Sequence, residues 1–183
     1  MRVLIVSHNV FSRTNNMGKT LLSYFRDFRP DEIAQFYIHS EIPTDDSICH
    51  RYYRFTDKDA LKSLFSFRRR GRIFTKDDIQ TDRVSARTDT GLVGSVYQMG
   101  RKRTALIYGL RNLLWKPRRW NTPELKQWVL DFDPDIIFFA SGDYAFMYDV
   151  ARTIADLAGK PLAVCCMDDY YLHDRNKKSL LGP

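Results

Sequence analysis

Residues 7–20, SHNVFSRTNNMGKT, end in the Gly-Lys-Thr that closes a phosphate-binding loop, and they follow a short apolar run. In such a loop, G-x-x-x-x-G-K-[ST], the backbone amides surround the phosphates of a nucleoside triphosphate. The motif requires its first glycine at position 13. Arg13 occupies that position instead, and its Cβ blocks the tight turn. The roughly ten residues between Ser7 and Gly18 are also more than this loop needs. The pattern therefore favours an ordinary helix start.

We predict that Gly18 and Lys19 open a helix of about residues 18–28, capped by Asn15 or Asn16 and stopped by Pro30. A helix N-terminus after the first strand of an α/β sheet still favours anions. Asn16, Gly18 and Lys19 are therefore the residues that we expect to face a donor phosphate. We interpret His8, earlier in the same loop, as a hydrogen-bond donor that stabilises the loop.

A second group of polar residues follows two later apolar runs. The candidates for acceptor binding are Ser141, Gly142, Asp143, Tyr144, Asp168, Asp169 and Tyr170. A carboxylate pair at 168–169 could orient or deprotonate a sugar hydroxyl, or form a plain ion pair with Arg175 or Lys177. Asp143 could bind the acceptor or cap the following helix. The tyrosines could stack on sugar faces or pack in the protein.

The net charge of +7 is concentrated in one segment. Residues 68–120 hold 14 Lys and Arg against four Asp, and no acidic residue occurs between Thr90 and Pro123. Within it, RKRTALIYGLRNLLWKPRRW has the pattern of an amphipathic helix that either packs on the core or rests on an anionic bilayer. The candidate membrane contacts are Arg101, Lys102, Arg103, Arg111, Trp115, Arg118, Arg119 and Trp120, with both tryptophans at headgroup level. Nucleic acid fits this segment less well, because no known nucleic-acid module is present.

The elements that must position these residues alternate between strand and helix. The expected strands are 3–7, 33–38, 48–55, 136–140 and 162–167, and the expected helices are 18–28, 57–65, 123–132 and 144–158. Thr122 should cap one helix, and Gly159 should end another. Continuously apolar strands between helices predict a doubly wound parallel sheet, an α/β fold of the Rossmann-like type. Residues 66–103 lack any period and form a basic, partly flexible excursion.

The bulk properties suit one globular domain over residues 1–183, with 44% hydrophobic residues. No apolar run approaches the roughly 20 residues that span a bilayer, and residues 1–9 form a first strand instead of a signal peptide. The three cysteines show neither a disulfide framework nor metal-ligand spacing. We therefore predict a cytoplasmic protein with no metal and no cofactor.

The stretch from Pro134 to Tyr171, PDIIFFASGDYAFMYDVARTIADLAGKPLAVCCMDDYY, resembles the N-terminal domain of a retaining, nucleotide-sugar-dependent GT-B glycosyltransferase. The resemblance lies in a P-D-I-I strand, the turn 141–143, a helix that ends in Gly-x-Pro at 159–161, and an Asp-Asp pair at 168–169. It covers most of residues 1–65 and 120–175. Many relatives have a histidine where this chain has Ser141 and Gly142, and paired glycines where it has Met17 and Gly18.

This resemblance implies an acceptor-binding domain for a lipid-linked or polysaccharide acceptor, peripheral on the cytoplasmic membrane. It also implies that the nucleotide sugar is bound mainly by a second Rossmann-like domain, which we expect to be absent from these residues. The catalytic residues stay unassigned, and the chain alone is expected to be inactive. Three alternatives stay open: a P-loop NTPase that uses Lys19 and Thr20 with Asp168 as magnesium ligand, a flavodoxin-like or receiver module, and a basic nucleic-acid-binding domain.

Overall fold

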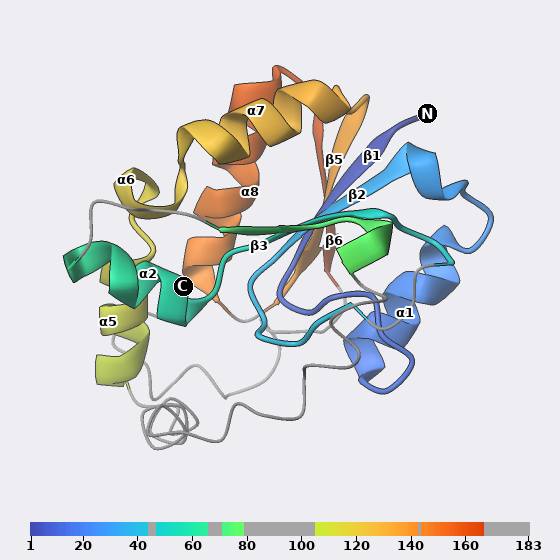
Figure 1. Ribbon diagram of the computed structural model, residues 1–183. Helices are drawn as coiled ribbons and strands as arrows, with labels where there is room; N and C mark the ends of the chain where they lie inside the picture. Colours follow the sequence, from blue (N-terminus) through green and yellow to red (C-terminus); the bar gives the residue numbers. More distant parts are fainter. Residues whose placement is uncertain (44–46, 66–70, 79–104, 143, 167–183) are drawn as a thin grey trace.

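The computed structural model describes residues 1–43, 47–65, 71–78, 105–142 and 144–166. These residues form one six-stranded sheet in the order β4-β3-β2-β1-β5-β6, with helices packed against it (Figure 1). The strands are β1 (Val3–Ser7), β2 (Ile33–Tyr37), β3 (Arg51–Arg54), β4 (Arg72–Phe74), β5 (Ile136–Ser141) and β6 (Leu162–Cys166). The helices are α1 (Asn16–Phe25), a short 3-10 helix η1 (Pro30–Glu32), α2 (Asp57–Phe65), α5 (Ala105–Leu114), α6 (Pro117–Trp120), α7 (Pro123–Phe132) and α8 (Ala145–Ala158).

The sheet is parallel except at one edge. β1 pairs in parallel with β2 and β5, β2 with β3, and β5 with β6, whereas β4 pairs antiparallel with β3. Helices cover both faces of the sheet, with α1 on one side and the remaining helices of Figure 1 on the other. The α/β class predicted from the alternating pattern is therefore confirmed, and the sheet is parallel as predicted except for its β4 edge. The arrangement is compatible with a Rossmann-like fold, because the chain order reverses between β1 and β5.

Side chains alternate between two apolar cores along the central strand. Leu4 and Val6 of β1 pack in the core beneath α7 and α8, while Val3 and Ile5 pack in the core beneath α1. All five residues of β1 are buried, as are all five of β2. A strand that is covered on both faces must be apolar in both directions, which explains the continuous apolar runs of the sequence.

The helices begin and end at residues with clear capping chemistry. Asn15 caps α1, Thr122 caps α7 by accepting from the amide of Leu125, and Thr56 accepts from the amide of Asp59 at the start of α2. Gly159 ends α8 in the left-handed conformation, at φ 63°. α1 starts two residues earlier than predicted and ends at Phe25, three residues before the predicted limit.

Part of the predicted excursion belongs to the sheet. Arg72, Ile73 and Phe74 form β4, the antiparallel edge strand, with Phe74 buried opposite Tyr52. Three residues are too few to show a period of two, so the sequence pattern could not reveal this strand. Residues 66–70 and 79–103 of that prediction lie outside the described residues.

The two tryptophans of the basic segment lie in the core, so their predicted place among lipid headgroups is wrong. Trp115 and Trp120 are 2% and 1% exposed. Trp115 stacks on Phe146 with ring centroids 4.9 Å apart, and the indole N–H of Trp120 donates to the carbonyl of Trp115 at 3.0 Å. The apolar side of this segment faces the sheet because burying two indoles in the core stabilises the fold more than leaving them at the surface.

Candidate functional site

The carboxyl ends of β1, β2 and β5 meet at the point where the strand order reverses. Open α/β sheets bind their ligands at such a point, because the loops there diverge and leave room. Here the side chains that follow the three strands are His8, His39 and Tyr144. Arg111 of α5 and Asp57, the first residue of α2, complete what we call the edge cluster.

Tyr144 lies between two nitrogen-rich groups of the edge cluster. Its ring stacks on the imidazole of His8, with centroids 5.2 Å apart and planes 19° from parallel. The guanidinium carbon of Arg111 lies 4.2 Å from the centroid of the same ring, which is a close cation–π contact. Because the protein itself contacts the ring in this way, Tyr144 acts by holding polar groups in place more than by offering a bare aromatic face.

Asp57 fixes the position of Arg111. The Nε atom of Arg111 donates to Oδ2 of Asp57 at 2.9 Å and to Oδ1 at 3.2 Å, and Nη2 forms an ion pair with Oδ2 at 2.9 Å. The indole N–H of Trp115 donates to Oδ1 at 2.6 Å. Paired donation to one carboxylate orients a guanidinium more strictly than a single contact does. Arg111 was expected at a membrane surface, and the structure places it instead in this partly buried ion pair.

The two histidines are close neighbours, with ring centroids 5.6 Å apart. The main chain links them as well, since the carbonyl of His8 accepts from the amides of Ile38 and His39. Burial lowers the pKa of His8, and the positive charge of Arg111 acts in the same direction against its bond to Asn9. Burial also lowers the pKa of His39, although the nearby carboxylate of Glu41 opposes the effect. Both rings are therefore neutral at neutral pH.

On the α1 side of the same edge, a second set of polar groups is bonded internally, and we call it the loop network. The buried amide of Gln35 donates to Ser7 Oγ at 2.8 Å and to the Asn9 carbonyl at 3.0 Å, and it accepts from the Phe11 amide at 3.1 Å. Glu41 accepts from Ser12 Oγ at 2.8 Å and from Asn15 Nδ2 at 2.7 Å. These bonds fix the loop that joins β1 to α1.

The loop network occupies the groups that a phosphate would need. Asn15 Oδ1 accepts from the amide of Gly18 at 2.6 Å, so that amide is already bonded within the chain. A Cβ on Gly18 would lie 2.7 Å from the backbone nitrogen of Ser12, which explains the glycine by close packing. Asn16 and Lys19, the other residues predicted to face a donor phosphate, are exposed on α1.

The predicted acceptor residues fall into two groups. Ser141 is buried and donates from Oγ to the carbonyl of Cys165 at 3.1 Å, which ties β5 to β6. No described residue lies within 4 Å of a Cβ built on Gly142, and Tyr144 belongs to the edge cluster. Asp143, Asp168, Asp169 and Tyr170 lie outside the described residues.

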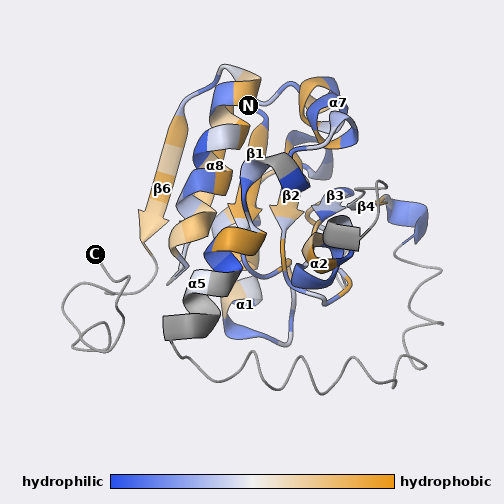
Figure 2. Ribbon diagram, turned by 90° about the vertical axis from the view of Figure 1, so that its left-hand side faces the viewer, coloured by the Kyte–Doolittle hydropathy of each residue, from blue (hydrophilic) through white to orange (hydrophobic). Residues whose placement is uncertain are grey.

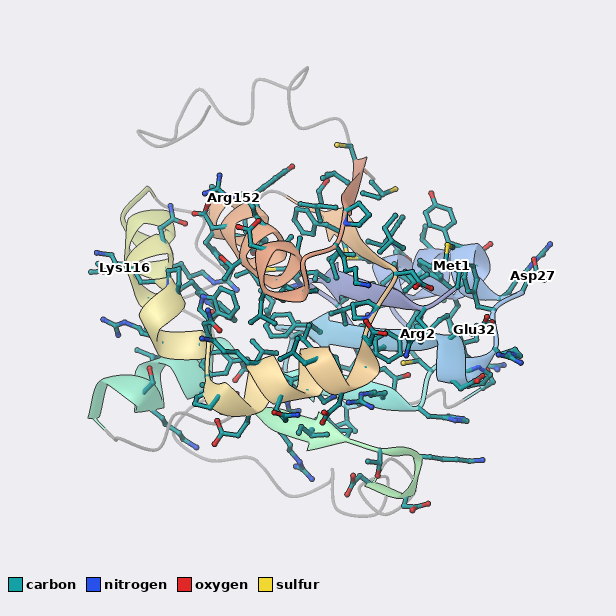
Figure 3. The ribbon with its side chains drawn as sticks, turned by 90° about the horizontal axis from the view of Figure 1, so that it is seen from above. Met1, Arg2, Asp27, Glu32, Lys116 and Arg152 are labelled. Carbon is teal, nitrogen blue, oxygen red and sulfur yellow. The ribbon has the colours of Figure 1, made fainter. Side chains whose placement is uncertain are left out.

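The remaining surface candidates are few. Lys116 is exposed and points away from the sheet in Figure 3, and Arg119 is partly exposed. Arg118 lies in α6, and its side chain is outside the described part of the chain, as are Arg101, Lys102 and Arg103. None of the described helices combines the length and the apolar character needed to cross a bilayer.

Sequence reasoning missed three residues of this edge. Asp57 entered the sequence analysis only as the first residue of an expected helix, and neither Gln35 nor His39 was singled out. A lone amide within the apolar run IAQFYI is a signal that could have revealed Gln35, because a buried amide needs partners. His39 follows β2 as His8 follows β1, so the rule on strand ends could have found it.

An apolar hollow of about 320 Å³ lies on the α1 face, apart from both sets of polar groups. It is lined by Met1, Val3, Tyr24, Phe25, Phe28, Ile136, Phe138 and Cys165. The described side chains that line it are apolar except for the Tyr24 hydroxyl and the Cys165 thiol, and none of them carries a charge. The edge cluster is therefore the better candidate for the functional site.

The chain matches no known protein family, and searches of curated proteins and of solved structures find no significant match either. Among the described residues, no three His, Cys, Asp or Glu side chains come together in a way that could hold a metal ion. The chemistry that this edge can support therefore has to be argued from the side chains themselves.

Proposed function

We propose that this chain is the acceptor-binding domain of a GT-B glycosyltransferase, which moves a hexose from a nucleotide sugar to a lipid-linked or polysaccharide acceptor with retention. The observation that carries the proposal is the edge cluster, in which Tyr144 contacts both His8 and Arg111 where the strand order reverses. The doubly wound arrangement of a GT-B half also agrees with helices on both faces of the sheet.

The chemistry of the cluster suits a polyhydroxylated ligand. A sugar is bound by several rigidly held donors and acceptors beside aromatic rings. The edge cluster supplies imidazole nitrogens, a guanidinium and a carboxylate within one contact network. Under this proposal the acceptor is bound by the edge cluster, and the nucleotide sugar is bound mainly by a second domain.

Titration of the ¹⁵N-labelled chain with oligosaccharides tests the proposal. We expect amide shifts concentrated at His8, His39, Arg111 and Tyr144, and weak or no shifts with UDP- and GDP-sugars. Arg111→Gln should raise the apparent Kd for the oligosaccharide by roughly three- to tenfold, because it removes a charged donor. Arg152→Gln is the matched control, since Arg152 is exposed on α8 (Figure 3).

Three other ligands distinguish the remaining functions in the same assay. Mg-ATP would shift the amides near Gly18 and Lys19 if the chain were a P-loop protein, and FMN would bind tightly to a flavodoxin-like module. An oligonucleotide would bind with a steep dependence on salt. Tight binding of any one of these, with no response to oligosaccharides, would contradict the proposed function. The internal bond from the Gly18 amide to Asn15 argues against the first.

A further inference from the structure

His8 has a defined tautomer in its neutral form. Its Nδ1 lies 2.7 Å from the side-chain oxygen of Asn9. An amide oxygen can only accept, so the proton of the neutral ring is on Nδ1. Nε2 of His8 therefore carries a lone pair and can accept a hydrogen bond from a ligand.

His39 has the opposite tautomer. Its Nδ1 lies 3.3 Å from the backbone nitrogen of Glu41. A backbone N–H can only donate, so Nδ1 of His39 is the acceptor and the ring proton is on Nε2. Nε2 of His39 can therefore donate a hydrogen bond to a ligand.

The two opposite tautomers lie side by side and are open to solvent. The ring centroids are 5.6 Å apart, and both side chains are partly exposed. Within the described residues, neither Nε2 has a hydrogen-bond partner, and neither is among the buried polar atoms that lack one. One ring thus offers an acceptor and its neighbour offers a donor at the same edge of the sheet.

We propose that His8 and His39 form a complementary pair that binds one neutral hydroxyl group, which donates to Nε2 of His8 and accepts from Nε2–H of His39. A hydroxyl is the common ligand group that donates and accepts through one atom. The identification of this hydroxyl as one of an acceptor sugar rests on the proposed function. The pair itself rests on the two tautomers and the distance between the rings.

The charges around the histidine pair make its preference between a neutral hydroxyl and an anion depend on pH. Arg111 of α5 is positive and faces both rings, Asp57 of α2 neutralises it, and Glu41 lies beside His39. Tyr144, ahead of α8, stacks on His8. When both imidazoles take up protons, Nε2 of His8 changes from acceptor to donor. The pair then offers two donors and no acceptor, so it loses its preference for a group that both donates and accepts, and it attracts an anion such as phosphate.

Long-range ¹H–¹⁵N correlation spectra of the imidazoles test the pair in the ligand-free chain at about pH 7.5, where model histidine is neutral. We expect the Nδ1–H tautomer for His8 and the Nε2–H tautomer for His39. Methyl α-glucopyranoside, added at millimolar concentrations, should shift Nε2 of both rings. His8→Phe and His39→Phe should each raise its Kd roughly three- to tenfold, because each removes one hydrogen bond. His50→Phe, at a histidine outside the edge cluster, is the control.

Each result decides between the pair and the wider function. Equal tautomers in the two rings would overturn the pair whatever the chain binds. Opposite tautomers with glycoside shifts that avoid both rings would overturn the pair and leave the acceptor function standing. Opposite tautomers with no response to any saccharide anywhere in the chain would overturn both. Inorganic phosphate that binds more tightly at neutral pH than at acidic pH would also contradict the pair.

Discussion

The edge cluster and the loop network share one end of the sheet but differ in how their polar groups are used. In the loop network, Gln35, Asn15 and Glu41 bond to other parts of the chain. In the edge cluster, His8 and His39 each have one nitrogen bonded within the chain and one open to a ligand. The difference teaches that polar residues at strand ends are not by themselves a binding site. Donors and acceptors left open by the fold are what a ligand can use.

Gln35→Leu should produce the largest effect, because it removes the centre of the loop network. The substitution leaves the buried Phe11 amide without its acceptor and removes the two bonds that Gln35 donates, although Ser7 Oγ and the Asn9 carbonyl stay bonded to each other. We expect the free energy of unfolding to fall by roughly 3 kcal/mol, measured by urea denaturation. Gln127→Leu, at an exposed glutamine of α7, should change it little. A small effect at Gln35 would mean that the loop holds its shape without this amide.

Gly18→Ala tests whether the loop network is tightly packed. The new Cβ would lie 2.7 Å from the Ser12 nitrogen and 2.8 Å from the Val10 carbonyl oxygen, and backbone atoms yield little. We expect a loss of roughly 2 kcal/mol in spite of the better helix propensity of alanine. Gly142→Ala is the matched control, because nothing in the described part of the chain lies within 4 Å of its added Cβ. Equal stabilities for the two variants would show that the loop is loosely packed.

Asp57→Asn weakens the edge cluster without changing its shape. It removes the charge that holds Arg111 and leaves a partly buried guanidinium unpaired. We expect the free energy of unfolding to fall by roughly 1–2 kcal/mol and the affinity for oligosaccharide to fall with it. Asp149→Asn, at an exposed aspartate of α8, should affect neither. Unchanged oligosaccharide affinity in a folded Asp57→Asn variant would separate Arg111 from ligand binding.

The pH dependence of the free energy of unfolding tests the edge cluster separately from the loop network, because both histidines belong to the edge cluster. Burial holds the pKa of His8 and of His39 below the unfolded value, so the unfolded chain takes up protons first as the pH falls. The stability contributed by the neutral rings is present above about pH 6.5 and is lost as the pH falls from there toward the lower folded pKa values. Chemical denaturation across this window should show a smaller slope in the His8→Phe, His39→Phe double variant. An unchanged slope would contradict the neutral state of the pair.

The smallest expected effect is on the binding of the protein to anionic membranes. With both tryptophans in the core, attachment to anionic vesicles would rest on charge alone, at roughly 1 kcal/mol per basic residue near the surface. We expect weak co-sedimentation that disappears with added salt. It should decrease further in the Lys116→Gln, Arg119→Gln variant, with Lys126→Gln of α7 as control. Binding that resists salt would point to an apolar contact outside the described residues.

The sequence was a good guide to elements and a poor guide to the contacts between them. The helix at 57–65 was predicted with its observed limits and the helix after Thr122 with its observed start, because caps and apolar spacing are local signals. The edge cluster could be placed only in part. The ion pair between Arg111 and Asp57 joins residues that are 54 positions apart. No local sequence pattern contains such a tertiary contact. The amphipathic pattern around Trp115 fitted a membrane surface and a protein core equally well, and only the fold separates them.

The two outer strands give the sheet unlike borders. At the β4 border, Arg72 of β4 lies opposite Arg54 of β3 in the strand register, so this border is charged. The other border is β6, whose residues LAVCC are hydrophobic throughout (Figure 2), with Val164 47% exposed and Cys166 exposed. Charge at an edge discourages pairing with a second sheet, and an apolar edge invites it. Self-association of this protein should therefore begin at β6, where Cys166 would turn a passing contact between two molecules into a disulfide under oxidising conditions.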